Sequence, residues 1–209
     1  MARPRGHALP LCSTLGFRRW REGPRVIVVV MGVAGAGKTT VGSALARALG
    51  WAFIDGDDMH PTASLDKMSR GEPLDDKDRM PWLESLARLI AGMERERKDA
   101  VFACSALREV YRAKLSENSP RILWVYLRAE PATIRTRLAA SRGHFAGASL
   151  IDSQFATLEE PRHGLALDAA QPPEAIVAQV LEELRSLDSH SVAGKSKAAR
   201  RDRVRTRSA

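Results

Sequence analysis

The sequence predicts an α/β fold of three layers, in which a parallel sheet of about five strands is covered by helices on both faces. Short apolar segments alternate with longer segments of helical periodicity along residues 26–189. The first of them, VIVVVM at 26–31, is a continuous apolar run, as expected for a strand that is buried on both faces of a parallel sheet. Repeated strand–helix units favour this architecture, because each connection lays a helix on one face of the sheet.

The elements are predicted in order from local signals. Strands are expected at 26–31, 51–54, 100–104, 122–127 and 165–167, and the last is weak. Helices are expected at 39–49 and 62–70, from near Asp78 onward, at 111–115, at 131–142, at 149–159 and at 173–187. Pro131 and Pro173 stand at helix starts, and Ser149 with Asp152 resembles a capping box.

Charge divides the chain into a body and two basic ends. The net charge is +8, of which +5 lies in residues 1–25 and +6 in residues 190–209, so residues 26–189 carry −3. A nucleic-acid-binding body is therefore not supported. We expect a disordered basic leader at 1–25, one folded domain at 26–189 and a disordered basic tail at 190–209. The leader has no acidic residue before Glu22, which leaves a mitochondrial transit peptide as an alternative.

Neither a membrane segment nor a disulfide framework is indicated. The longest apolar run, at 26–31, has six residues and is far too short to span a bilayer. The two cysteines, Cys12 and Cys104, belong to no CxxC motif or Cys/His cluster. Two reduced thiols in a cytoplasmic protein are the favoured interpretation.

The strongest motif is GVAGAGKT at 32–39, which fits the pattern G-x4-G-K-[ST] directly after a strand and at the start of a helix. Its glycines let backbone N–H groups wrap around phosphate, so the motif predicts a P-loop and the P-loop NTPase fold. Lys38 would reach the β- and γ-phosphates of ATP, and the hydroxyl of Thr39 would bind Mg²⁺. We assign nucleotide binding to nine residues: Gly32, Val33, Ala34, Gly35, Ala36, Gly37, Lys38, Thr39 and Thr40.

A second motif, DGDDMH at 55–60, follows the second strand. Ligands of open α/β sheets gather at such strand ends. Phosphoryl transfer needs one carboxylate near the metal and another near the attacking hydroxyl, and we assign these roles to Asp55 and Asp57. His60 either binds the substrate or orders the loop before Pro61.

The segment PLDDKDRMPWL at 73–83 opens the long helix and contains a cation that helix physics does not explain. Asp78 is placed to cap the helix, whereas Arg79 in the first turn works against the helix dipole. A guanidinium suits a carboxylate or a phosphate, so we favour Arg79 as a ligand for an anionic substrate over a surface arginine. Trp82 is expected in the core.

Arginines near residues 135–145 are typical of a closing lid, because a lid must neutralise the transferring phosphoryl group. We place the lid at about 137–160 and assign Arg137 and Arg142 to it. Arg135 is expected on a solvated helix face.

Six motifs together resemble the gluconokinases: GVAGAGKTT, LGWAFIDGDDMHP, KMSRGEPLDDKDRMPWL, CSALREVYR, YLRAEPATIRTRL and RGHFAGASLIDSQFATLEEP. The resemblance runs from about Val26 to Leu187. It implies ATP and Mg²⁺ as cofactors, gluconate converted to 6-phosphogluconate, five parallel strands, a mobile lid and, in many members, a homodimer. By the same resemblance, Asp57, His60 and Arg79 would lie beside the substrate.

Two alternatives remain open at this point. One is another P-loop kinase for a small molecule, such as shikimate or a different aldonate, although PLDDKDRMPWL argues against shikimate. The other is a nucleotide-binding protein without activity, against which the intact Lys38, Thr39, Asp57 and Arg79 argue.

Overall fold

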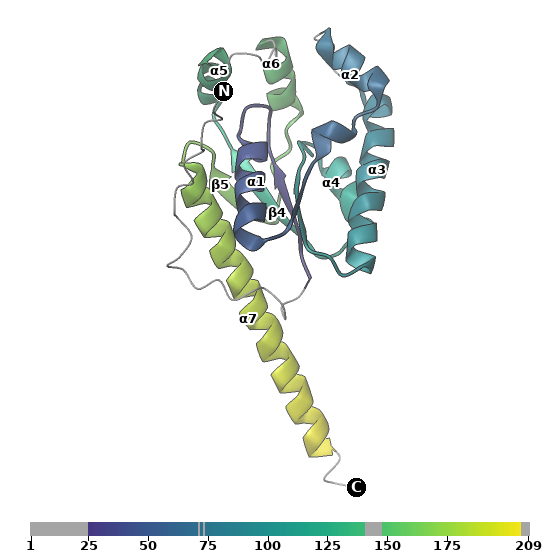
Figure 1. Ribbon diagram of the computed structural model, residues 1–209, viewed down its shortest axis with the longest axis vertical. Helices are drawn as coiled ribbons and strands as arrows, with labels where there is room; N and C mark the ends of the chain where they lie inside the picture. Colours follow the sequence, from purple (N-terminus) through teal and green to yellow (C-terminus); the bar gives the residue numbers. More distant parts are fainter. Residues whose placement is uncertain (1–24, 71, 73, 141–147, 206–209) are drawn as a thin grey trace, which may run out of the picture.

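A five-stranded, wholly parallel sheet forms the centre of the fold, with the strand order β2-β3-β1-β4-β5 (Figure 1). The structure is a computed structural model that describes residues 25–70, 72, 74–140 and 148–205. The strands are β1 (Ile27–Met31), β2 (Ala52–Asp55), β3 (Ala100–Ala103), β4 (Ile122–Arg128) and β5 (Leu165–Asp168). The predicted fold class and the five predicted strands are confirmed, each within one or two residues.

Helices cover both faces of this sheet. They are α1 (Lys38–Leu49), α2 (Thr62–Ser69), α3 (Asp76–Arg95), α4 (Glu109–Ser116), α5 (Pro131–Ala140), α6 (Ala148–Thr157) and α7 (Pro173–Arg205), with the short 3-10 helix η1 (Gly56–Met59) after β2. In Figure 1, α1 and α7 lie on one side of the sheet, and α3 and α4 lie on the other. The helices α5 and α6 lie beyond the carboxyl end of β1, the strand that leads into the P-loop.

The central strand supplies both cores, because successive side chains of a strand point to opposite faces. Val28 and Val30 pack in the core under α1 and α7, whereas Ile27, Val29 and Met31 pack in the core under α3 and α4. All five residues of β1 are buried, which is why this segment is a continuous apolar run.

Several helix boundaries differ from the prediction by one or two residues, and three differences change a predicted cap or a helix end. The N-cap of α3 is Asp75, and Asp78 is the third helical residue of the capping box, so Asp78 completes the cap and does not begin it. The capping box expected at Ser149 is wrong, because α6 begins one residue earlier, at Ala148. The helix end expected at 187 is also wrong, since α7 continues to Arg205. Its last turns are rich in Ala, Lys and Arg, which favour helix even without an apolar stripe.

Some predictions fall on residues outside those described. Among them are residues 1–24 of the basic leader that was expected at 1–25, and Arg142. No helix in the described part of the chain is long and apolar enough to cross a membrane.

Candidate active site

The P-loop connects β1 to α1, and its three glycines, at 32, 35 and 37, all have positive φ angles that a side chain would disfavour. Gly32 has φ 144°, and a Cβ there would lie 2.8 Å from the carbonyl oxygen of Leu127. Gly37 is the N-cap of α1 with φ 97°. Glycine adopts such angles without steric cost, so the loop can turn tightly and aim its N–H groups at an anion at the start of α1.

Lys38 and Thr39 follow at the first two positions of α1. The Lys38 side chain folds back over the loop, and its ammonium group donates to the carbonyl oxygen of Val33 at 3.2 Å. The hydroxyl of Thr39 donates to Asp55 Oδ2 at 2.7 Å. The structure thus brings the two predicted metal ligands into contact, although they lie 16 residues apart in the chain. Thr40 is exposed in the first turn of α1.

Residues of the core under α3 and α4 fix the loop after β2. Trp82 Nε1 donates to the carbonyl oxygen of Gly56 at 2.7 Å, and Trp82 is only 2% exposed. A Cβ at Gly56 would lie 2.8 Å from the carbonyl oxygen of Ala103, so β3 leaves no room for a side chain there. Asp55 Oδ1 accepts from the N–H of Asp57 at 3.1 Å. Trp82 is in the core, as predicted, and it also fixes the segment that carries both aspartates.

His60 lies at the end of this loop and stacks on Trp82, with ring centroids 4.2 Å apart. Burial lowers the pKa of His60, and nearby Arg79 lowers it further, whereas Asp57 acts in the opposite direction. Its Nδ1 atom is buried and has no partner among the described residues. These influences place Asp57, His60 and Arg79 in one neighbourhood, on the carboxyl side of the sheet.

Arg79 lies in the first turn of α3, and its Nη1 atom donates to the hydroxyl of Tyr111 on α4 at 3.3 Å. Its guanidinium carbon lies 5.8 Å from the centre of the Tyr111 ring. The neighbouring Asp78 is engaged differently, since Lys67 of α2 contacts both of its oxygens, at 2.7 and 2.8 Å. This ion pair lowers the pKa of the Asp78 carboxyl group.

Arg137 at the start of the predicted lid and Arg135 just before it are both described, and each has a partner. Arg137 donates to the carbonyl oxygen of Ala169, just after β5, at 2.6 Å. Arg135 is exposed, as expected, and its Nη2 atom donates to Asp152 Oδ1 at 2.6 Å, which links α5 to α6. This exposed ion pair bridges two helices that lie side by side.

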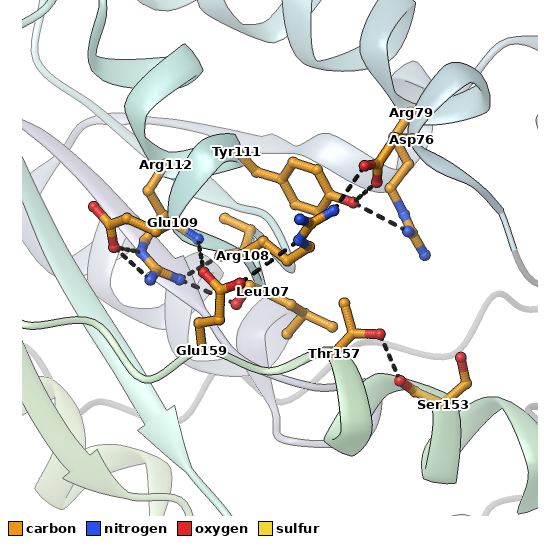
Figure 2. A network of polar contacts seen from close by, with 11 residues as sticks. Asp76, Arg79, Leu107, Arg108, Glu109, Tyr111, Arg112, Ser153, Thr157 and Glu159 are labelled. Carbon is orange, nitrogen blue, oxygen red and sulfur yellow. Dashed lines mark hydrogen bonds and ion pairs between the residues drawn. The ribbon is translucent and has the colours of Figure 1, made fainter.

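Sequence reasoning missed several residues that surround the site. The side chain of Gln154 on α6 accepts from the N–H of Ala34 in the P-loop at 2.6 Å. Figure 2 shows a second group, in which Arg108 and Tyr111 contact Asp76, and Glu159 contacts the start of α4. These residues lie within motifs quoted above, but periodicity and spacing do not show contacts between distant segments.

A buried arginine holds the turn that presents this second group. Arg112 is 3% exposed and donates to the carbonyl oxygens of Ala106 and Leu107, at 2.9 and 3.2 Å. Ala106 has φ 41°, a conformation that residues other than glycine seldom adopt. The contacts from Arg112 offset this strain and fix the loop between β3 and α4.

Comparisons with known proteins agree with the geometry. A family model described as shikimate kinase matches residues 34–185, more than half of the chain. The thermoresistant gluconokinase of Escherichia coli (strain K12) is 41% identical over 163 residues, which are 76% of this chain and 93% of that protein. The gluconokinase of Gluconobacter oxydans (strain 621H) is 38% identical over 168 residues, which are 79% of this chain and 94% of that protein.

A solved structure leads to the same family. The crystal structure of a gluconokinase from Sinorhizobium meliloti 1021 is 40% identical, has a TM-score of 0.74, and matches 83% of this chain and 99% of that one. The relatives are matched over nearly their whole length, and the family model spans residues 34–185, which include most of the P-loop, both aspartates and Arg79. The chain therefore belongs to the gluconokinase family of P-loop kinases.

Proposed function

We propose that this protein is a gluconokinase, which transfers the γ-phosphoryl group of ATP to D-gluconate and forms 6-phospho-D-gluconate. The observation that carries the proposal is that a P-loop, two aspartates at the end of a strand and Arg79 lie on one side of the sheet of a gluconokinase-family chain. The product, 6-phospho-D-gluconate, would enter the pentose phosphate pathway.

The nucleotide side follows from the P-loop. Backbone N–H groups between Gly32 and Thr39 hold the phosphates, with Lys38 as the cation at the transferred group. Arg137, and Arg142 outside the described residues, are assigned to the lid and neutralise charge that develops during transfer. In this structure the Arg137 side chain reaches the end of β5, where it donates to the carbonyl oxygen of Ala169.

The residues present suit a magnesium ion. Thr39 and Asp55 offer two oxygen ligands that are 2.7 Å apart. Mg²⁺ in proteins commonly takes one or two protein oxygens and completes its shell with phosphate and water. When bound, it neutralises phosphate charge, and we assign Thr39 and Asp55 to hold it.

The substrate side is assigned to Asp57, His60 and Arg79. Gluconate has a carboxylate at one end and the reacting hydroxyl at the other, so the enzyme must anchor the first and present the second. Arg79 holds the carboxylate, because a guanidinium can donate two parallel hydrogen bonds. Asp57 is exposed beside the P-loop and accepts the proton of the attacking hydroxyl. His60 is kept neutral by its lowered pKa and contributes a hydrogen-bonding face.

A kinase for another aldonate or for shikimate is the alternative, and a panel of acids as substrates distinguishes them. A cytoplasmic location and a homodimer stay predictions.

Two substitutions test the site assignment, because one should change mainly KM for gluconate and the other mainly kcat. Arg79→Lys keeps the charge but loses the planar fork, so it should raise KM for gluconate roughly tenfold and leave KM for ATP unchanged. Asp57→Asn keeps the shape but loses the base, so it should lower kcat by about 100-fold or more. Steady-state kinetics with coupled detection of ADP measure both.

Matched controls come from the same elements. Arg88 is an exposed arginine of α3, and Asp58 is the exposed neighbour of Asp57. Arg88→Lys and Asp58→Asn should therefore leave KM for gluconate and kcat near the wild-type values. The assignment is wrong if Arg79→Lys raises KM for ATP and leaves KM for gluconate unchanged, or if Asp57→Asn has the same kcat as Asp58→Asn.

A further inference from the structure

The hydroxyl of Tyr111 lies between Arg79 and the carboxylate of Asp76 (Figure 2). It bonds Asp76 Oδ1 at 2.5 Å and Arg79 Nη1 at 3.3 Å. Tyr111 is 2% exposed, and its ring packs in the core under α3 and α4. The Tyr111 ring is therefore buried, while its hydroxyl contacts Arg79, the residue assigned to bind the substrate carboxylate.

Counting protons fixes the direction of each bond in this group. Arg79 can only donate, and an ionised Asp76 can only accept. The bond from Tyr111, and then the bond from Arg108, hold the pKa of Asp76 below its usual value, so this carboxyl group is ionised at neutral pH. The single proton of Tyr111 must therefore point at Asp76, which leaves a lone pair of the hydroxyl for Arg79.

Arg108 prevents the carboxylate of Asp76 from turning away. Its Nη1 atom donates to Asp76 Oδ2 at 2.7 Å, and its guanidinium carbon lies 5.5 Å from the centre of the Tyr111 ring. Its Nε atom lies 3.6 Å from Glu159, whose own backbone N–H donates to Leu107. The two oxygens of Asp76 thus have separate donors, one for each.

We propose that Tyr111 is a positioning residue, which holds one edge of the Arg79 guanidinium so that the remaining donors face the substrate carboxylate. Asp76 and Arg108 fix the orientation of the Tyr111 hydroxyl. A guanidinium has five N–H donors, and the bond to Tyr111 occupies one of them. This inference rests on the proposed function, in which Arg79 binds the carboxylate.

Tyr111→Phe tests this role, because it keeps the buried ring and removes only the hydroxyl. We expect KM for gluconate to rise roughly fivefold to tenfold, the effect of one hydrogen bond, with KM for ATP unchanged. The chain has one other tyrosine, Tyr126 on β4, which is 3% exposed. Tyr126→Phe is the matched control and should leave KM for gluconate unchanged.

A second variant guards against a folding defect in the core. Asp76 lies at the start of α3 and has a half-exposed side chain, so Asp76→Asn should fold. The amide it introduces can donate to the Tyr111 oxygen, which releases the hydroxyl proton toward Arg79. KM for gluconate should rise here too, with an unfolding midpoint near that of the wild type.

The Arg79→Lys background separates positioning from a general effect on structure. If Tyr111 acts through the guanidinium, Tyr111→Phe should add less than about twofold to KM for gluconate in that background. An equal rise in both backgrounds, or no rise in the wild-type background when Arg79→Lys does raise KM, overturns the inference and leaves the proposed function standing. If Arg79→Lys leaves KM for gluconate unchanged, the substrate role of Arg79 fails, and the inference fails with it.

Discussion

Trp82→Phe should destabilise the protein and slow the reaction together, because Trp82 joins the core to the loop that carries Asp55 and Asp57. The substitution removes the donor to the buried carbonyl oxygen of Gly56, now 2.7 Å from Nε1. A buried acceptor without a partner costs about 1–3 kcal/mol. The smaller ring adds about 1 kcal/mol for the space it leaves, since Trp82 is 2% exposed.

The expected loss is therefore about 2–4 kcal/mol of unfolding free energy. For a domain of this size, that corresponds to a fall in Tm of roughly 5–15 °C. Thermal and urea unfolding followed by circular dichroism measure it. The kcat for gluconate, measured well below the lowered Tm, should fall about tenfold or more, because a small displacement of catalytic groups is costly.

Trp124→Phe is the matched control, since Trp124 is a half-buried tryptophan that packs against the same core from β4. It should lose less stability and retain the wild-type kcat. The reasoning is refuted if the two variants lose equal stability, or if Trp82→Phe is destabilised but keeps full kcat. The second result would mean that the aspartate loop holds its shape without the bond from Trp82.

Three further predictions follow from the site. Lys38→Ala should abolish phosphoryl transfer with an unchanged circular dichroism spectrum, and near-normal turnover would contradict the P-loop assignment. His60 has a lowered pKa in the folded state, so the unfolded chain takes up its proton first as the pH falls below the ordinary value of 6.5. The stability of the wild type relative to His60→Gln should therefore shrink as the pH falls through the ordinary value of 6.5 in urea titrations, and a constant difference would mean that His60 does not titrate as we infer. A fragment of residues 25–189 should fold and keep most of the activity, and a folded but inactive fragment would give the basic ends a catalytic role.

Local patterns predicted the parts of this fold that depend on local chemistry. The β1 segment is apolar throughout because both of its faces are buried, and the P-loop motif is recognisable because Gly32 and Gly37 need their unusual φ angles. Thr39 and Asp55 could be expected at the same edge of the sheet, since Thr39 follows the carboxyl end of β1 and Asp55 is the last residue of β2, although β3 lies between these two strands.

Contacts between distant segments were not predictable in the same way. Gln154 and Ala34 are 120 residues apart, and Tyr111 and Asp76 are 35 apart. Nothing in the periodicity of α4 distinguishes the hydroxyl of Tyr111 from that of any core tyrosine. Arg135 carried the pattern of a solvated residue, and its pairing with Asp152 depends on how α5 and α6 pack.

The most direct test of the central claim is the identity of the product that the full-length protein makes from gluconate and ATP with Mg²⁺. Phosphorus NMR, with ADP release measured in parallel, should show 6-phosphogluconate formed in a one-to-one ratio with ADP. Glucose, which has no carboxylate for Arg79, should be a very poor substrate, and shikimate should not be phosphorylated. Equal turnover of glucose and gluconate would contradict anchoring by Arg79, and faster turnover of shikimate or another acid would contradict the assignment as a gluconokinase.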